Sequence, residues 1–459
     1  MTDSITRRFP RDFMWGVASS AYQIEGGAKE GGRGPSIWDT FSHTPGRTAD
    51  GATGDVAIDH YNRYRQDVAL MAELGVDAYR FSISWSRLLP DGVGAVNQGG
   101  IEFYVDLCDS LLEAGITPVA TLYHWDLPQA LQDRGGWLEP ASVEWFAEYA
   151  AVAKRALGDR IRIWSTLNEP WCVAFLGHSS DVFAPGLGRP EAGFLVAHHL
   201  MLAHNRAMTV MRDVNPHADD QLGVVLNLIP AEPAGDDPSD VAVAETVDAI
   251  HSQQFLSGIL EGKYPERIRR LHERFGVADQ IDEAELAATR VDLDYLGVNY
   301  YNINRFRFDP ASPGLAEYPG ADGAVLVRPP GELTDMEWGV EPQGLTIVLE
   351  RVAELAPDLP LYVTENGAAY PDEVGPDGEV VDPKRIAYLD SHIAAVADAL
   401  DRGVDVRGYF VWSIFDNFEW ASGYGIRFGI VRIDYATLER MVKASGWWYR
   451  DFIAAQRAC

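Results

Sequence analysis

The sequence predicts an α/β fold, a single (β/α)8 TIM barrel with long βα loops that occupies residues 1–459 as one domain. Three observations predict it. The chain has 459 residues, of which 47% are hydrophobic, enough for one large core. It contains eight short apolar runs that read as strands, and each is followed by a stretch with helical periodicity. This alternation is typical of a parallel barrel surrounded by helices.

The eight apolar runs have the composition of buried strands. Several are apolar at consecutive positions rather than at alternate ones, which indicates strands covered on both faces. In chain order the predicted strands are 13–20, 78–84, 117–124, 162–168, 222–229, 294–301, 361–366 and 406–413.

Amphipathic stretches separate these runs. In 60–74, Tyr64, Val68 and Met71 recur at helical spacing, and Gly75 follows as a stop signal. The other predicted helices are 101–115, 141–157, 191–212, 240–260, 344–355, 383–402 and 438–455. An open doubly wound sheet is the alternative, but no GxGxxG motif follows the first strand.

The segment 303–335 is rich in Pro and Gly and has little periodicity. It reads either as a linker between domains or as a long βα loop after the sixth strand. We favour the loop, because one barrel accounts for both flanking regions and barrel function is carried by such loops.

Charge and hydropathy exclude several classes of partner. The formal net charge is −30, so a nucleic acid or an anionic membrane surface would be repelled. No stretch of about eighteen apolar residues predicts a membrane span, and the first residues lack the apolar run of a signal peptide. We therefore expect a cytoplasmic protein.

The cysteines and histidines predict no metal site. Cys108, Cys172 and Cys459 have no disulfide or zinc spacing, and Cys172, although near Glu169, is expected to be a packing residue. Four histidines are expected in the core or on helix faces, rather than as metal ligands: His178, His198, His199 and His204. No cofactor is predicted either.

Polar and aromatic residues gather where the predicted strands end. Glu169 follows the fourth strand in "STLNEP", and Glu365 closes the seventh in "VTENG". The carboxyl ends of barrel strands meet on one face, so these two carboxylates are expected in one pocket. Two carboxylates beside an acetal carbon can divide the work of glycoside hydrolysis.

The aromatic content fits a sugar ligand. The segment 412–425, "WSIFDNFEWASGYG", places indoles beside Asp, Asn and Glu. A sugar has apolar C–H faces and a rim of hydroxyls, so aromatic platforms and carboxylate acceptors suit it. Within this segment, Glu419 is positioned to accept hydroxyl protons while Trp412 or Trp420 stacks on the ring.

The sequence resembles glycoside hydrolase family 1, the family of retaining β-glucosidases. The motifs that carry the resemblance are "FPRDFMWGVASSAYQIEGG" (9–27), "YRFSISWSRLLP" (79–90), "YHWDLPQAL" (123–131), "TLNEP" (166–170), "GVNYY" (297–301), "YVTENG" (362–367) and "FDNFEW" (415–420). They run in order over almost the whole chain.

The resemblance implies a role for each matching residue. Glu169 would be the acid/base and Glu365 the nucleophile, with Arg80 and Tyr301 orienting Glu365. The implied substrate-binding residues are Gln23, His124, Trp125, Asn168, Asn299, Trp338, Trp412, Glu419, Trp420 and Phe428. Taken without the resemblance, Arg80 is as readily an ordinary buried ion-pair partner, and His124 a core histidine. Glu25 is expected to make structural hydrogen bonds only.

The resemblance also implies a substrate class. Glu169 is not replaced by Gln, and Glu419 would repel a 6-phosphorylated sugar. The expected activity is hydrolysis of terminal β-D-glucosyl residues, with some β-galactosyl or β-fucosyl tolerance, from a small oligosaccharide or an aryl or alkyl β-glucoside. Cellulose degradation is the expected context. Two alternatives stay open: a transglycosylating β-glycosidase and a catalytically weak sugar-binding relative.

Overall fold

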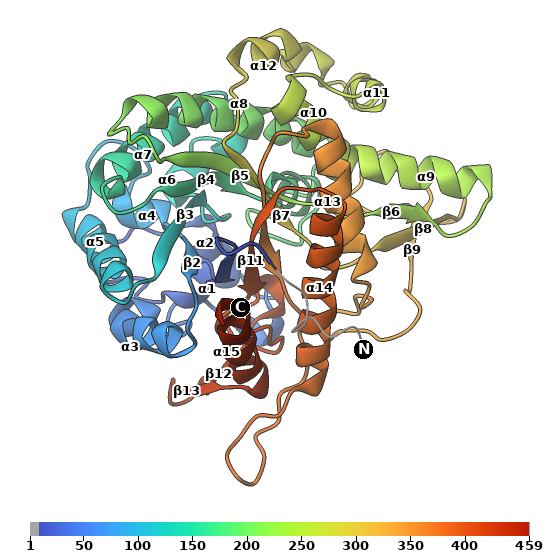
Figure 1. The fold of residues 1–459 in the computed structure, drawn as a ribbon. Coiled ribbons are helices and arrows are strands. Elements are labelled where there is room, and N and C mark those ends of the chain that lie inside the picture. Colours follow the sequence, from blue (N-terminus) through green and yellow to red (C-terminus); the bar gives the residue numbers. More distant parts are fainter. Residues whose placement is uncertain (1–8, 459) are drawn as a thin grey trace.

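The computed structural model describes residues 9–458. Within them, eight parallel strands close a barrel in which β11 pairs with β1 (Figure 1). In barrel order the strands are β1 (Met14–Ala18), β2 (Ala78–Ser82), β3 (Thr117–Tyr123), β4 (Ile163–Asn168), β5 (Gln221–Asn227), β7 (Tyr295–Asn299), β10 (Leu361–Asn366) and β11 (Val406–Trp412). Each coincides with a predicted run to within a few residues, so the predicted fold class is confirmed.

The burial of the strands explains their composition. Every residue of β2, β4, β7 and β10 is buried. A barrel strand faces the packed interior on one side and the surrounding helices on the other, so alternation of polar and apolar residues is lost.

Six predicted helices form close to their expected bounds: α3 (His60–Glu73), α5 (Gln98–Glu113), α7 (Ser142–Leu157), α8 (Ala192–Asp213), α13 (Gln343–Leu355) and α14 (Pro383–Asp401). In α3 the buried face carries Tyr64, Val68 and Met71, as the periodicity predicted. Gly75 follows with a φ of 67°, a left-handed conformation that glycine adopts without strain.

Two predicted helices differ from the structure. The stretch 240–260 is divided into α9 (Pro238–Asp248), a π-helical turn (Ala249–Gln253) and α10 (Gln254–Glu261). The stretch predicted as 438–455 becomes helical only at α15 (Ala444–Arg457), because β13 (Arg440–Val442) pairs with β12 (Val431–Ile433). Lys443, at the junction, is buried and bonded to Asp372 and Asp416, so tertiary contacts set the start of α15.

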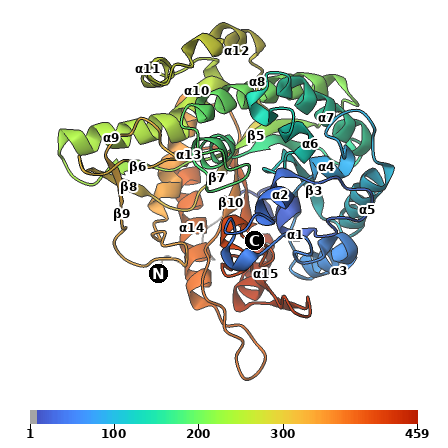
Figure 2. The ribbon, with the colours of Figure 1, turned by 180° about the vertical axis from the view of Figure 1, so that it is seen from behind.

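The segment 303–335 lies in the connection after β7, the sixth strand of the barrel, as expected. It is not irregular throughout, because it forms β8 (Asn304–Phe308) and β9 (Ala324–Val327). These strands make a three-stranded sheet with β6 (Ala231–Pro233), next to α9 in both views (Figures 1 and 2). Because β6 and β8 follow β5 and β7, this sheet extends the carboxyl end of the barrel.

Shorter helices in the connections were not predicted. They are α1 (Ala21–Ile24), α2 (Ile37–Ser42), α4 (Trp85–Leu88), α6 (Gln129–Gln132), α11 (Glu266–Arg274), α12 (Glu283–Thr289), the 3-10 turns Ala49–Gly51, Gly136–Leu138, Ala278–Gln280 and Trp420–Ser422, and the π-helix Cys172–Ser179. Most have too few turns to produce a readable periodicity.

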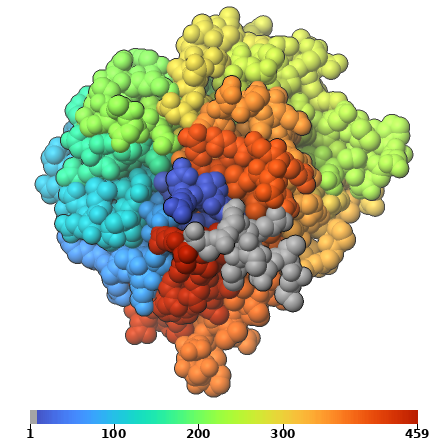
Figure 3. All heavy atoms as spheres, viewed as in Figure 1, coloured from blue at the N-terminus to red at the C-terminus, as the bar shows by residue number. Residues whose placement is uncertain are grey.

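The amino end of the barrel is closed by aromatic packing. Phe9 lies 4.8 Å from Trp15 between ring centroids, and Trp15 lies 4.9 Å from Phe452 of α15. In Figure 3 the first described residues, in dark blue, fill the centre of this face. In residues 9–458 no helix is long and apolar enough to cross a membrane. Expectations about the first eight residues and Cys459 lie outside the described residues.

Candidate active site

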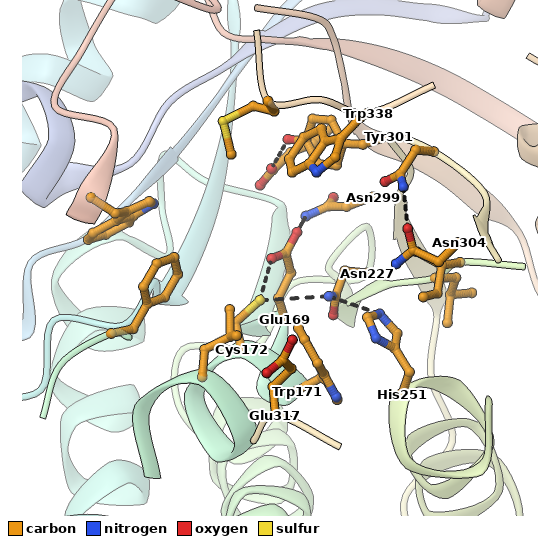
Figure 4. A pocket seen from close by; sticks show the side chains of 18 of the residues that line it. Glu169, Trp171, Cys172, Asn227, His251, Asn299, Tyr301, Asn304, Glu317 and Trp338 are labelled. Carbon is orange, nitrogen blue, oxygen red and sulfur yellow. Dashed lines mark hydrogen bonds between the residues drawn. The ribbon is translucent and has the colours of Figure 1, made fainter. Parts of the chain in front are cut away.

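A cavity of about 260 Å³ lies at the carboxyl end of the barrel (Figure 4). The predicted site residues that line it are His124, Trp125, Glu169, Asn299, Tyr301, Trp338, Glu365, Trp412, Glu419, Trp420 and Phe428. Gln23, Arg80 and Asn168 are buried directly behind this wall and bond to residues that line it or lie beside it. The structure therefore brings all the predicted residues into one region.

The two glutamates reach the cavity through local departures from regular strand geometry. The pairing of β10 with β7 shifts between Val363 and Glu365, and that of β4 with β5 shifts between Ser165 and Asn168. Glu169 follows β4 with a left-handed φ of 50°. Such irregularities re-aim side chains and are typical of active sites.

Glu365 lies between a cation and a hydroxyl donor. Arg80 Nη1 donates to Glu365 Oε1 at 2.7 Å, and the Tyr301 hydroxyl donates to Oε2 at 2.7 Å. Burial raises the pKa of Glu365, but the Arg80 charge and both hydrogen bonds act in the opposite direction. These contacts favour the carboxylate form.

Glu169 is bonded to no cation among residues 9–458. Asn299 Nδ2 donates to Oε1 at 2.6 Å, and the Cys172 thiol donates to Oε2 at 3.1 Å. Burial, and after it the negative charge of Glu365, raises the pKa of Glu169 to about 8. The two carboxyl groups titrate as a coupled pair in which Glu365 ionises first.

A hydrogen-bonded chain connects the two glutamates. Arg80 Nη2 donates to Asn168 Oδ1 at 2.7 Å, and Asn299 Nδ2 donates to the same oxygen at 3.1 Å. Because Arg80 also holds Glu365 and Asn299 also holds Glu169, the orientation of each carboxyl group depends on the same buried network.

The inner part of the cavity combines a carboxylate with aromatic rings. Glu419 is half-buried there, and burial raises its pKa to about 8, with added repulsion from Glu365 and Glu169. Gln23 Nε2 lies 3.4 Å from Glu419 Oε2 and also bonds to the Phe418 carbonyl. Gln23 therefore supports Glu419 from behind, and its contact with a ligand stays a prediction.

His124 offers an unused polar atom at the cavity wall. Asn168 Nδ2 lies 3.2 Å from His124 Nε2, and burial keeps the pKa of this imidazole well below its usual value. A neutral ring that accepts at Nε2 carries its hydrogen on Nδ1. His124 Nδ1 is buried without a protein partner, so it is available to donate to a ligand hydroxyl.

Aromatic rings form the remaining inner walls. The His124 ring lies nearly parallel to Trp412 and Trp420, with centroids 5.8 and 5.9 Å away. Trp125 Nε1 donates to the Asn168 carbonyl at 2.9 Å, which fixes this indole beside Trp420. These rings supply the apolar surface that a sugar face requires.

A second aromatic cluster lies around Trp338. Trp338 packs against Tyr301 and Phe428, with ring centroids 5.2 and 6.1 Å away. Many residues of the cavity lining were not predicted, among them Trp171, Asn227, His251, Asn304, Glu317 and Tyr318. Of these six, only Asn227, at the end of β5, and Trp171, next to "NEP", carried a positional signal in the sequence.

The remaining predictions divide into confirmed and corrected ones. Glu25 bonds to Arg87 at 2.9 Å and Tyr104 at 2.5 Å, so its structural role is confirmed. Cys172 is buried, as expected of a packing cysteine, and its thiol in addition donates a hydrogen bond to Glu169 that the sequence did not predict. The four histidines considered above are buried, on or beside α8. In the described part of the chain, no group of three or more His, Cys, Asp or Glu is arranged to hold a metal ion.

Charge limits the ligands that this cavity accepts. Glu169, Glu317, Glu365 and Glu419 line it, and among the described lining residues there is no Lys or Arg. Arg80 lies behind the wall and is already paired with Glu365. A cavity with this charge disfavours phosphorylated or carboxylated ligands.

Comparison with known proteins shows the family of the chain. Glycosyl hydrolase family 1 matches residues 5–458. The chain is 43% identical to beta-glucosidase A of Acetivibrio thermocellus over 445 residues, 97% of this chain and 98% of that protein. It is 44% identical to a bifunctional beta-D-glucosidase/beta-D-fucosidase of Bifidobacterium breve over an alignment of 469 residues, gaps included, which covers 99% of this chain and 100% of that protein.

A solved structure has the same fold. The beta-glucosidase from Thermotoga maritima in complex with glucoimidazole superposes with a TM-score of 0.92 at 43% identity, covering 98% of this chain and 99% of that chain. With the family matched over nearly the whole chain, the protein belongs to glycosyl hydrolase family 1.

Proposed function

We propose that the protein is a retaining β-glucosidase that hydrolyses terminal, non-reducing β-D-glucosyl residues. The observation that carries the proposal is the contrast between two buried carboxyl groups in one cavity. Glu365 is bonded to a guanidinium and a phenol, and Glu169 to an amide and a thiol. Such a contrast supplies one ionised nucleophile and one protonated acid at the same pH.

In the first step Glu365 attacks the anomeric carbon. A bond forms between its carboxylate and that carbon, the bond to the aglycone oxygen breaks, and Glu169 transfers its proton to the leaving oxygen. Asn168 and Asn299, which lie beside the glutamates, would bind the hydroxyl next to the reacting carbon. Hydrogen bonds to that hydroxyl strengthen in the transition state.

In the second step Glu169 changes role. Once Glu365 is an ester it has lost its charge, so its contribution to the raised pKa of Glu169 disappears. Glu169, now ionised, takes a proton from water while the water oxygen bonds to the anomeric carbon and the ester bond breaks. The two inversions retain the anomeric configuration.

The glycone is expected to be an unphosphorylated hexose. Glu419, the Nδ1 atom of His124 and the indoles of Trp412 and Trp420 offer an acceptor, a donor and apolar faces. The bifunctional relative from Bifidobacterium breve supports β-fucoside as a second substrate. The aromatic cluster around Trp338 suits either an aryl group or a second sugar ring as aglycone.

Azide rescue tests the proposal. With 4-nitrophenyl β-D-glucoside, Glu365→Gly should be inactive, and added azide should restore 4-nitrophenol release with α-glucosyl azide as product. In the matched variant Glu169→Gly, azide should instead yield the β-glucosyl azide from the enzyme-bound intermediate. Substantial activity of Glu365→Gly without azide would contradict the assignment of the nucleophile.

Three broader points are part of the same proposal. Residues 1–459 would form one catalytic domain, because the strands that bear the site are distributed from β1 to β11 around one barrel. A cytoplasmic location and a role in cellulose degradation are proposed with it. Glucose release from cellobiose and cell fractionation test these last two points.

A further inference from the structure

Cys172 is held against Glu169 by the local backbone. Its amide N–H donates to the Glu169 carbonyl at 2.9 Å, where the chain turns from β4 into the π-helix Cys172–Ser179. The same turn brings Sγ to 3.1 Å from Glu169 Oε2. Burial raises the pKa of the Cys172 thiol well above its usual value, so the sulfur carries a proton that it donates.

A chain of side chains continues behind the sulfur (Figure 4). Asn227 Nδ2 lies 3.7 Å from Cys172 Sγ and 3.2 Å from His251 Nε2. His251 Nδ1 lies 2.9 Å from the Tyr318 hydroxyl. Trp171 stacks on the His251 ring with centroids 4.1 Å apart, which fixes the plane of the imidazole.

The chemistry of these groups sets the direction of the chain. Burial lowers the pKa of His251 to about 3, so the ring is neutral at physiological pH. An amide nitrogen only donates, so Asn227 gives one hydrogen to His251 Nε2 and its other hydrogen faces the sulfur. With its lone pair engaged by Asn227, the thiol has its single hydrogen directed at Glu169.

We propose that Cys172 is a positioning residue for Glu169: its thiol, aligned by Asn227, His251 and Tyr318, orients the carboxyl group and stabilises its ionised form. The inference rests on the proposed function, in which Glu169 is an acid in the first step and a base in the second. A donor that prefers the carboxylate assists the second step without supplying a full positive charge.

Other charged and titratable groups also face Glu169. Besides Cys172, they are Arg80 on β2, Tyr301 after β7, Glu365 on β10 and Glu419 after β11. Arg80 favours the ionised form of Glu169 and the two other glutamates oppose it. Because these groups are unchanged when Cys172 is replaced, a difference between variants isolates the contribution of the thiol.

Replacing Cys172 with Ala removes a donor to the carboxylate, so the pKa of Glu169 rises. The pKa of Glu169 governs one limb of each pH profile, in the free enzyme for kcat/KM and in the glucosyl-enzyme for kcat, and both limbs should move upward. The alkaline limb of kcat/KM requires protonated Glu169, and the acid limb of a kcat limited by deglycosylation requires ionised Glu169. We expect each to shift by about 0.5 pH unit.

The experiment measures both profiles, with 4-nitrophenyl β-D-glucoside for kcat/KM and 2,4-dinitrophenyl β-D-glucoside for kcat. Cys172→Ser keeps a donor and should restore both limbs to within about 0.2 unit of the unaltered protein. Cys108→Ala is the matched control, because it removes another buried thiol, on α5, far from the cavity lining. It should leave both limbs in place.

The outcomes separate this inference from the proposed function. Two results would overturn the role of Cys172. In the first, both limbs of the pH profiles of Cys172→Ala coincide with those of the unaltered protein. In the second, the limbs of Cys172→Ser are shifted as far as those of Cys172→Ala. If the Ala variant does not fold, Asn227→Ala replaces it and should move both limbs in the same direction. The proposed function fails separately, through an active Glu365→Gly variant.

Discussion

Arg80 and Glu365 form a buried ion pair in which Nη1 lies 2.7 Å from Oε1 and the side chains are 1% and 4% exposed. The other terminal nitrogen of Arg80 holds Asn168, which also accepts from Asn299. One guanidinium therefore compensates the charge of one glutamate and organises the amides that reach the other, Glu169. Removing it should disturb charge and geometry together.

Arg80→Met should abolish nearly all activity and destabilise the fold by about 3–5 kcal/mol, because it leaves a buried carboxylate without its partner. Without the cation the pKa of Glu365 rises, so the acid limb of any residual kcat/KM should move to higher pH. Arg87→Met is the control, since Arg87 is equally buried but pairs with Glu25. Thermal unfolding should show that Arg87→Met lowers stability by a similar amount. If Arg87→Met also moved the acid limb of kcat/KM as far as Arg80→Met does, the role of Arg80 at Glu365 would be contradicted.

Tyr301→Phe removes the hydroxyl that donates to Glu365 Oε2 at 2.7 Å. A hydrogen bond to a charged group contributes about 1.5–3 kcal/mol, so kcat should fall roughly 10- to 100-fold. The neighbouring Tyr300 is a matched control, because its hydroxyl donates to the Glu341 carbonyl instead. If Tyr300→Phe lowered kcat as much as Tyr301→Phe, the effect would be structural rather than specific to the nucleophile.

The pH dependence of kcat/KM should reflect Glu169. Its pKa is raised to about 8, mainly by burial, and the first step requires the protonated form. Activity should therefore fall as the pH rises through about 8. In Glu169→Gln, assayed with 2,4-dinitrophenyl β-D-glucoside, whose leaving group needs no acid, this alkaline limb should disappear. Its persistence would assign the limb to another group, such as Glu419.

Phosphorylated substrates should be rejected. A 6-phosphate would enter a cavity lined by four glutamates, Glu419 among them, with no lining Lys or Arg among the described residues. We expect kcat/KM for 4-nitrophenyl 6-phospho-β-D-glucoside to be at least about 100-fold below that for the unphosphorylated compound. In Glu419→Gln this ratio should be smaller, because the substitution lowers kcat/KM for the glucoside and leaves kcat/KM for the phosphorylated compound unchanged. Equal use of both compounds by the unaltered protein would refute the charge argument.

Lys443 should matter for stability rather than for chemistry. Its buried ammonium bonds to Asp372 and Asp416, which joins the connections after β10 and β11 at the start of α15. Lys443→Met should lower the free energy of unfolding by about 3–5 kcal/mol. Lys384→Met, at an exposed pair with Glu332, should change it by less than about 1 kcal/mol. Chemical denaturation of both variants measures the difference.

Local sequence was sufficient for the barrel. Each strand is a short, nearly continuous apolar run, since burial on both faces selects such residues at every position, as in β4 and β10. The ends of these strands also placed Glu169 and Glu365 on one face, because parallel barrel strands share their carboxyl end. The candidate glutamates and part of the cavity wall were therefore predictable.

Other features were decided by contacts between distant segments. The start of α15 depends on β12 and on Asp372, and the strands in 303–335 depend on β6. Asp372 and β6 are far in sequence from the segments they contact, and the short β12–β13 hairpin leaves no helical period, so periodicity carried no trace of these contacts.

The same holds for the fine chemistry of the site. The sequence by itself determined the fold class, the two glutamates and the aromatic, acidic character of the cavity. Only the tertiary structure decided that Glu365 meets Arg80 while Glu169 meets Cys172, and that His251 lies behind that thiol. The physical reason is that burial and hydrogen-bond partners set a pKa. Burial and the contact of Arg80 with Glu365 arise when segments far apart in the chain pack together, and the contact of Cys172 with Glu169 depends on the π-helical turn that follows Glu169.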